Sequence, residues 1–170
     1  MNRRPDLEKL IYFNVDVLNQ GLQVLKAQEA VPGSDYSSHI GPHLRHVIEH
    51  YEAFTQQLPS HCVDYDSRAR DRAPERDPKV ARSRIEALKQ QLQILDVDAV
   101  SEPITVHMRG GISGEENFAS SSTLARELLF VASHAVHHYA LIQMYCRTQG
   151  IHLGEDFGKA PATLHHARAA

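Results

Sequence analysis

Tryptophan is absent from this chain of 170 residues, and only two cysteines occur, Cys62 and Cys146. Two cysteines cannot form the disulfide framework of a small extracellular protein, so we interpret both as packing residues in a reducing compartment. No apolar run approaches the roughly 20 residues that a membrane-spanning helix needs. The N-terminal residues also lack the short apolar stretch of a secretory leader. These absences predict a cytoplasmic protein without membrane partners.

An excess of charge of one sign is also missing. The 18 lysine and arginine residues are balanced by 21 aspartate and glutamate residues, which gives a net charge of -3. Because no basic block stands out, we expect no nucleic-acid partner. Apolar residues make up 42% of the chain and charged residues 23%, the usual proportions of a folded globular domain. We therefore expect a single domain over residues 1–170.

Four stretches repeat apolar residues every three or four positions, which is typical of amphipathic helices. They cover residues 6–28, 38–58, 78–95 and 123–148, approximately. The sequence predicts an all-α four-helix bundle with a small β-hairpin inserted before the last long helix.

The segments between and after these helices differ in composition. Residues 101–121 alternate β-branched and polar residues around Gly110 and Gly111, which predicts the hairpin. Residues 59–78 are charged and irregular, and composition leaves an ordered loop and a solvated linker equally open. The tail over about 150–170 is short of apolar residues after Phe157 and is expected to pack loosely.

Histidine is the residue in excess, with twelve copies. His134 and His138 are four residues apart on the apolar face of the last helix, whereas His137 is turned about 100° away. Two imidazoles on one helical face can reach one metal ion at about 2 Å. Two core histidines satisfied by hydrogen bonds are the alternative, and the paired spacing favours the metal.

The second helix offers a third ligand. Its histidines form a stripe of their own, made of His39, His43, His46 and His50. Helical periodicity slightly disfavours His46 as a ligand relative to His43 and His50, but it does not decide among the four. Three histidines with open positions would make a reactive metal site. The Glu that follows the first histidine in a metalloprotease motif is replaced by Ala135.

Two segments resemble a known family. SHIGPHLRH over residues 38–46 and SHAVHH over residues 133–138 are similar to motifs of the DinB/YfiT-like superfamily of metal-binding four-helix-bundle proteins. Weaker similarities at residues 64–68, 122–128 and 157–164 resemble a DinB-like subgroup, so the resemblance spans nearly the whole chain. The resemblance implies a homodimer and one divalent ion bound by His46, His134 and His138. Nickel and zinc are the most expected metals, followed by manganese and iron.

The resemblance also implies a function. Relatives include thiol-dependent transferases and isomerases, so we expect a metal-dependent thiol S-transferase or a hydrolase, acting on a low-molecular-weight thiol or a small anionic substrate. The alternative is a non-catalytic metal-binding stress-response protein. Metal binding should weaken below about pH 6.5, because the ligands must be neutral to coordinate.

Three further residues are candidates for catalytic roles. His50 lies one turn beyond His46 and would accept a proton, unless it is simply solvated. Glu127 would accept a hydrogen bond from a ligand imidazole, with a surface salt bridge as the equal alternative. Tyr65, together with Asp66 and Arg68, would fold over the site as a lid, and a structural loop tied down by ion pairs is at least as well supported.

Overall fold

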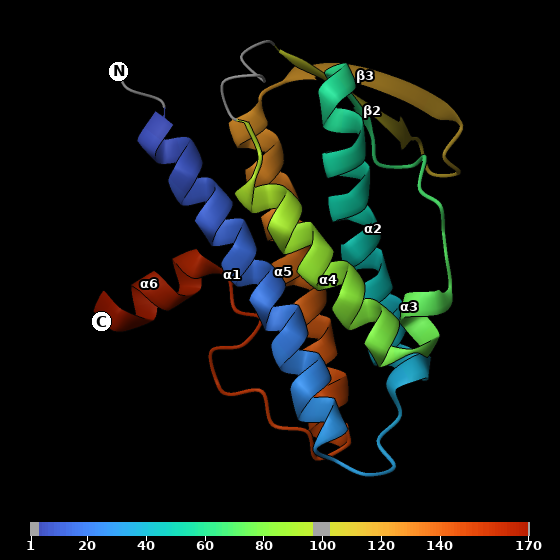
Figure 1. Ribbon diagram of the computed structural model, residues 1–170, viewed down its shortest axis with the longest axis vertical. Helices are drawn as coiled ribbons and strands as arrows, with labels where there is room; N and C mark the ends of the chain where they lie inside the picture. Colours follow the sequence, from blue (N-terminus) through green and yellow to red (C-terminus); the bar gives the residue numbers. More distant parts are fainter. Residues whose placement is uncertain (1–3, 97–102, 170) are drawn as a thin grey trace.

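The computed structural model describes residues 4–96 and 103–169 (Figure 1). Residues 101 and 102 of the predicted hairpin segment lie outside these described ranges. The helices are α1 (Arg4–Glu29), α2 (Gly41–Gln57), α3 (Ala73–Arg76), α4 (Pro78–Gln93), α5 (Leu124–Thr148) and α6 (Pro161–Ala169). The strands are β1 (Cys62–Asp64), β2 (Ile104–Gly110) and β3 (Glu116–Ser122), and the short helical turns are the π-helical η1 (Tyr36–Ile40) and the 3-10 helical η2 (Leu58–Ser60).

The prediction of an all-α four-helix bundle with a small inserted hairpin is wrong. The described part of the chain contains six α-helices and a three-stranded mixed sheet in the order β1-β2-β3. β1 comes from the 59–78 segment and pairs in parallel with β2, where Val63 lies opposite Val106. β2 and β3 pair antiparallel, as a hairpin does. A strand of three residues is too short to show a period of two, so the sequence pattern did not reveal it.

The tail is also better packed than expected. Ile151, Leu153 and Phe157 are buried, and the Phe157 ring lies 5.6 Å from the ring of Tyr139. The expectation of loose packing is therefore wrong for this first part of the tail. Helix α6 follows and projects from the long helices (Figure 1), without a buried residue.

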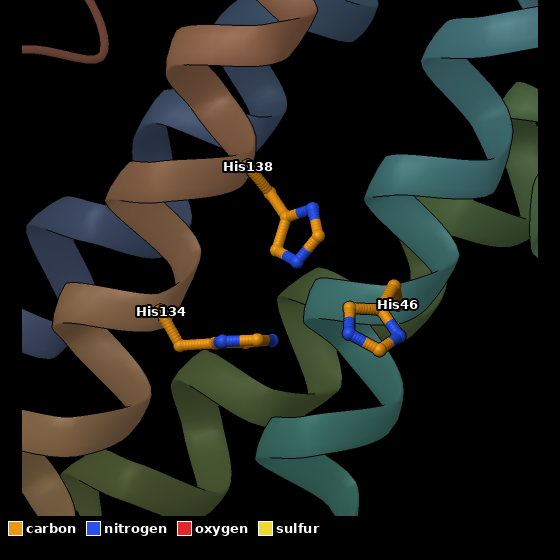
Figure 2. A group of neighbouring side chains, drawn as sticks. All are labelled: His46, His134 and His138. Atoms are coloured by element: carbon orange, nitrogen blue, oxygen red, sulfur yellow. The ribbon is translucent and has the colours of Figure 1, made fainter. Parts of the chain in front are cut away.

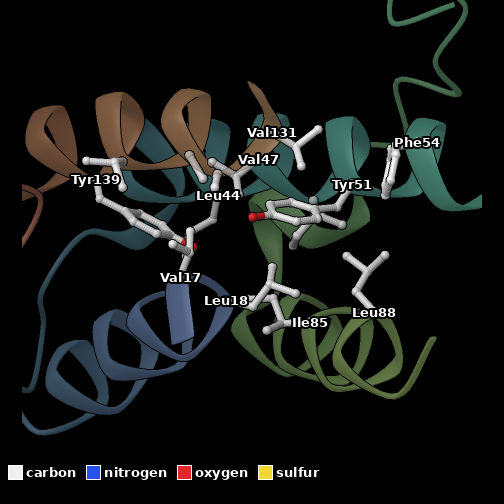
Figure 3. Packing of buried hydrophobic residues seen from close by; sticks show 14 of the residues in the cluster. Val17, Leu18, Leu44, Val47, Tyr51, Phe54, Ile85, Leu88, Val131 and Tyr139 are labelled. Atoms are coloured by element: carbon white, nitrogen blue, oxygen red, sulfur yellow. The ribbon is translucent and has the colours of Figure 1, made fainter. Parts of the chain in front are cut away.

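The packing of the four long helices brings the two histidine motifs next to each other. α1 packs against α4 and α5, and α2 packs against the same two helices, so α1 and α2 lie diagonally across the core (Figure 1). Large apolar side chains fill the space between them (Figure 3), and Tyr51 of α2 donates a hydrogen bond to Asn14 Oδ1 of α1 across 2.8 Å. The two helices that carry the histidine motifs, α2 and α5, are direct neighbours.

Local sequence explains where the site helices begin. The Asp35 side chain accepts a hydrogen bond from the Ser38 backbone N–H and caps η1, which leads directly into α2. Thr123 caps α5 in the same way. At Gly41 a Cβ would lie 2.1 Å from the Glu75 carbonyl oxygen, so glycine there allows α3 to pack against the first turn of α2. Among the described helices, none is both long and apolar enough to cross a membrane.

Candidate metal centre

Three histidines from two neighbouring helices converge. His46 lies on α2, and His134 and His138 lie one turn apart on α5. One nitrogen from each ring lies within 4.8 Å of the others, and Figure 2 shows the three rings turned toward a common space. His137 points away and is exposed, as the helical spacing predicts. The structure thus brings together the three residues that the family resemblance implies.

The three side chains fit a divalent ion. Nitrogens that bind one ion at about 2.1 Å lie no more than about 4.2 Å apart, so small side-chain rotations would close the observed spacing. Nε2 of His134 is buried and has no hydrogen-bond partner among the described residues. A buried nitrogen without a partner is unfavourable, and a metal ion at this place would satisfy it. Imidazole ligands suit several transition metals, so the ligand set leaves the metal type open.

The environment of the cluster keeps its imidazoles neutral. Burial is the main cause that lowers the pKa of His46 to about 2 and the pKa of His138 to about 3, with neighbouring histidines adding to the effect. Burial likewise lowers the pKa of His134. The rings are therefore neutral near pH 7, and each has a lone pair available for coordination.

His43 contacts the ligand set from outside. Its Nδ1 lies 2.9 Å from Nδ1 of His138, so one ring donates a hydrogen bond to the other. If His138 coordinates through Nε2, its Nδ1–H is the donor and His43 is the acceptor. His39, the remaining histidine of the stripe, is exposed and stacks on Tyr145 with ring centroids 4.2 Å apart.

His50 lies beside the three converging histidines and is held by a backbone hydrogen bond and by an arginine. Its Nδ1 donates to the His46 carbonyl across 2.8 Å. Nη1 of Arg68 lies 2.9 Å from Nε2 and 3.3 Å from Nδ1 of the same ring, so the guanidinium lies over the face of the imidazole. The side chain is 5% exposed, so the alternative of a solvated histidine is wrong. Burial also lowers the pKa of His50 to about 4.

Tyr65 and Glu127 form a buried pair. The Tyr65 hydroxyl donates to Glu127 Oε2 across 2.7 Å, and its ring stacks on His50 at 5.7 Å. Glu127 also accepts hydrogen bonds from Ser122 and Arg126. Within the described residues none of these bonds comes from His46, His134 or His138. The expectation that Glu127 accepts a hydrogen bond from one of these imidazoles is therefore wrong. The alternative is confirmed in part, because Glu127 forms an ion pair with Arg126 across 2.9 Å, but its carboxylate is fully buried and not at the surface.

Sequence reasoning missed Glu49, a buried carboxylate one turn beyond Arg45. Its Oε1 lies 3.9 Å from Nε of Arg45, and its Oε2 lies 3.8 Å from Nε of Arg68. Arg45 in turn pairs with Glu75 of α3 across 2.8 Å. A glutamate within a helix normally faces solvent, so only the position of Glu49 on the buried side of α2 could have indicated this network.

Comparisons with known proteins add little to this geometry. No protein-family model matches the chain, and no solved structure matches it. The chain is similar to a protein named FK506-binding protein 5 from Rhizopus delemar, with 29% identity over 106 residues. The matched region is 62% of this chain, and the chain spans only 28% of that relative's length.

Proposed function

We propose that this protein is a DinB-like metal protein that binds one divalent ion through His46, His134 and His138 and acts as a thiol S-transferase or a hydrolase. The observation that carries the proposal is the convergence of three neutral imidazoles, one of them with a buried nitrogen that lacks a partner. The two sequence motifs that resemble the family contain the same three histidines.

A divalent ion held here would lower the pKa of a thiol or a water molecule and so supply a nucleophile near neutral pH. Three neutral imidazoles leave the full charge of the ion uncompensated, which favours an anionic ligand such as a thiolate or carboxylate. Among the chain's own residues, His43 would orient His138, and the rings of Tyr65 and Phe130, 4.9 Å apart, would limit the access of water beside His134.

The first test is elemental analysis of protein purified without an affinity tag. We expect about one equivalent of nickel or zinc per chain, with manganese or iron as further candidates. Protein that contains no metal, and that does not take up zinc, nickel or cobalt from solution, would contradict the proposal.

The second test addresses chemistry. A small thiol added to cobalt-substituted protein should produce a thiolate-to-metal charge-transfer band, because the ion retains positions that protein ligands do not fill. Turnover with low-molecular-weight thiols and electrophilic partners should follow.

One observation favours the alternative, a metal-binding protein without catalysis. The polar atoms of Tyr65 and Glu127, two of the candidate acid–base groups, are engaged in hydrogen bonds, and so is Nδ1 of His50. Stoichiometric metal with no response to any thiol or carboxylate would support this alternative and contradict the enzymatic one.

A further inference from the structure

Strand β3 forms one edge of the sheet, which lies at one end of the long helices (Figure 1). Within the described part of the chain, β3 pairs only with β2. Residues 116–121 are all exposed, although successive side chains of a strand point to opposite faces, so the described residues cover neither face of β3. A strand with one neighbour and so little packing is only marginally held, and a second strand beside it would stabilise it.

The hydrogen bonds of β2 show which backbone groups of β3 point outward. Thr105 donates its N–H to the His61 carbonyl, and Arg109 donates its N–H to the Asp66 side chain, so these alternate residues of β2 face β1 and its following segment. In an antiparallel pair, the residues opposite them also turn their N–H and C=O groups away from the partner strand. The outward residues of β3 are therefore Asn117, Ala119 and Ser121. Among the described residues, no other segment hydrogen-bonds to these outward backbone groups.

This free edge lacks the features that usually keep strands from pairing. Residues 117–122 contain no charged residue and no proline. β2 and β3 also pair residue by residue along the whole of β3, without a bulge that would twist the edge away. The backbone of another strand can therefore approach β3 directly.

The outward groups of β3 match those of a second copy of β3. In an antiparallel pair with a two-fold axis at Ala119, Asn117 lies opposite Ser121 of the other copy, and Ala119 lies opposite its own equivalent. Outward residues then meet only outward residues, and because each such pair exchanges two hydrogen bonds, the three pairs allow about six. The two Glu116 side chains lie at opposite ends of the pair, so like charges do not oppose each other.

An exposed aromatic side chain on the same strand favours this partner. Phe118 is 58% exposed, and Met108, which lies opposite it on β2, is 44% exposed. In the two-fold arrangement the two Phe118 side chains, one from each copy, are diagonal neighbours on one face of the sheet, about 7 Å apart and within reach of each other. Pairing would thus remove apolar surface of both copies from water.

We propose that two copies of this chain associate through β3, which joins their two sheets into one continuous sheet. The family resemblance implies a homodimer without indicating the surface that forms it, and the free edge of β3 supplies that surface. The inference does not depend on metal binding. One strand and one aromatic side chain per copy make a small interface, so the dimer should dissociate on dilution.

Amide hydrogen exchange followed by NMR tests the inference on wild-type protein. In dilute protein the outward N–H groups of Asn117, Ala119 and Ser121 should exchange freely. At concentrations where light scattering gives twice the mass of one chain, they should exchange at least about tenfold more slowly. The inward N–H groups of Phe118 and Ser120 are the internal control and should change little, because β2 already protects them.

Three outcomes of these measurements would overturn the inference. The first is wild-type protein that remains a single chain at every concentration. The second is a dimer in which the outward N–H groups still exchange freely. The third is slow exchange of these groups that does not depend on concentration, because the chain itself would then cover the edge.

Variants separate this edge from the exposed apolar surface of the helices. Ala119→Pro removes one outward N–H without removing a bond to β2, so the chain should keep its circular dichroism spectrum while the dissociation constant of the dimer rises at least about tenfold. Ala119→Val retains the N–H and is the matched control. Leu129→Lys on α5 should stay dimeric. A dimeric Ala119→Pro together with a monomeric Leu129→Lys would overturn the inference and assign the interface to the helices.

Discussion

The histidines of α2 differ in what their ring nitrogens contact, and the contacts give each residue a separate role. His46 joins the converging set, His43 shares a hydrogen bond with His138, and the Arg68 guanidinium lies over the ring of His50. His39 only stacks on Tyr145 near the surface. Substitutions along this one helix face should therefore have graded effects on metal binding.

On α5, replacing His134 or His138 by Ala should abolish stoichiometric metal binding, because two histidines do not hold a divalent ion as tightly as three. His137→Ala should bind normally, since its ring is exposed on another side of the helix. Metal content after dialysis against a weak chelator measures the difference. Loss of metal in His137→Ala with retention in His134→Ala would show that the wrong helix face has been assigned.

On α2, His46→Ala should lose the metal, whereas His43→Ala should weaken binding by about tenfold to a hundredfold, because His43 fixes the orientation of His138. His43→Gln should recover part of the affinity by offering an acceptor oxygen. His39→Ala is the control and should match wild type. Equal affinity in wild type, His43→Ala and His46→Ala would contradict both assignments.

As the pH falls, the metal-free protein should unfold before the histidines of the folded site become protonated. Burial lowers the pKa of His46 to about 2, that of His138 to about 3 and that of His50 to about 4, whereas histidine in an unfolded chain titrates near 6.5. Below about pH 6.5 the unfolded chain binds more protons, so the free energy of unfolding falls as pH falls, by about 1.4 kcal/mol per pH unit for each such histidine.

We therefore expect the thermal midpoint of the metal-free protein, followed by circular dichroism, to drop between pH 7.5 and pH 5.5. His50→Gln should show a shallower pH dependence, and His137→Ala an unchanged one. Metal release below pH 6.5, which the sequence predicts, should accompany unfolding rather than protonation of the folded site. Release from protein that stays fully folded at that pH would contradict this account.

At the scale of single residues, the sequence predicted part of the candidate site. Spacing along a single helix separated His134 and His138 from His137, because 100° per residue decides which side chains share a face. The same rule mildly disfavoured His46, and only the family resemblance selected it. Contacts between separate segments, such as that of Arg68 in the loop after β1 with His50 on α2, depend on how the segments pack, and helical periodicity carries no information about that.

Among the secondary-structure elements, the first turn of α2 is closely packed by its neighbours. It follows the π-helical turn η1 and lies directly against α3, whose Glu75 pairs with Arg45. The absence of a side chain at Gly41 permits this approach.

Gly41→Ala should lower the free energy of unfolding by about 1–3 kcal/mol, because its Cβ would clash with the Glu75 backbone rather than with a movable side chain. Gly21→Ala on α1 is the matched control. Its Cβ would meet only side-chain atoms at 3.0 Å and beyond, and alanine favours the helix, so the net change should be small. Urea unfolding measures both, and an unchanged Gly41→Ala would contradict the close approach.

Element length decided what the sequence could predict. The four long helices were expected within a few residues of their observed ends, because each repeats its apolar pattern over several turns. β1 and α3, of three and four residues, are too short for any repeat. Because neither was predicted, the sequence indicated an isolated hairpin where the structure has a three-stranded sheet, and the predicted fold class was wrong.

For the whole molecule, the homodimer stays a prediction from the family resemblance. Leu129 and Met144 of α5 are 50% and 64% exposed, and Tyr12 of α1 is 66% exposed, so apolar surface is available on these helices. Light scattering coupled to size-exclusion chromatography should give twice the 19.1 kDa mass of one chain. A single-chain mass at micromolar concentration would contradict the prediction.

The diagonal placement of α1 and α2 has a consequence for synthesis on the ribosome. The first two long helices to emerge are not each other's partners, since both bury their apolar faces against α4 and α5. A nascent chain that ends before α5 can pack both helices against α4 alone, so the parts of their stripes that contact α5 stay exposed. Release of the last long helix completes the core and, in the same event, brings the α5 histidines to those of α2. The candidate metal centre and the hydrophobic core should thus mature together, once α5 has left the ribosome.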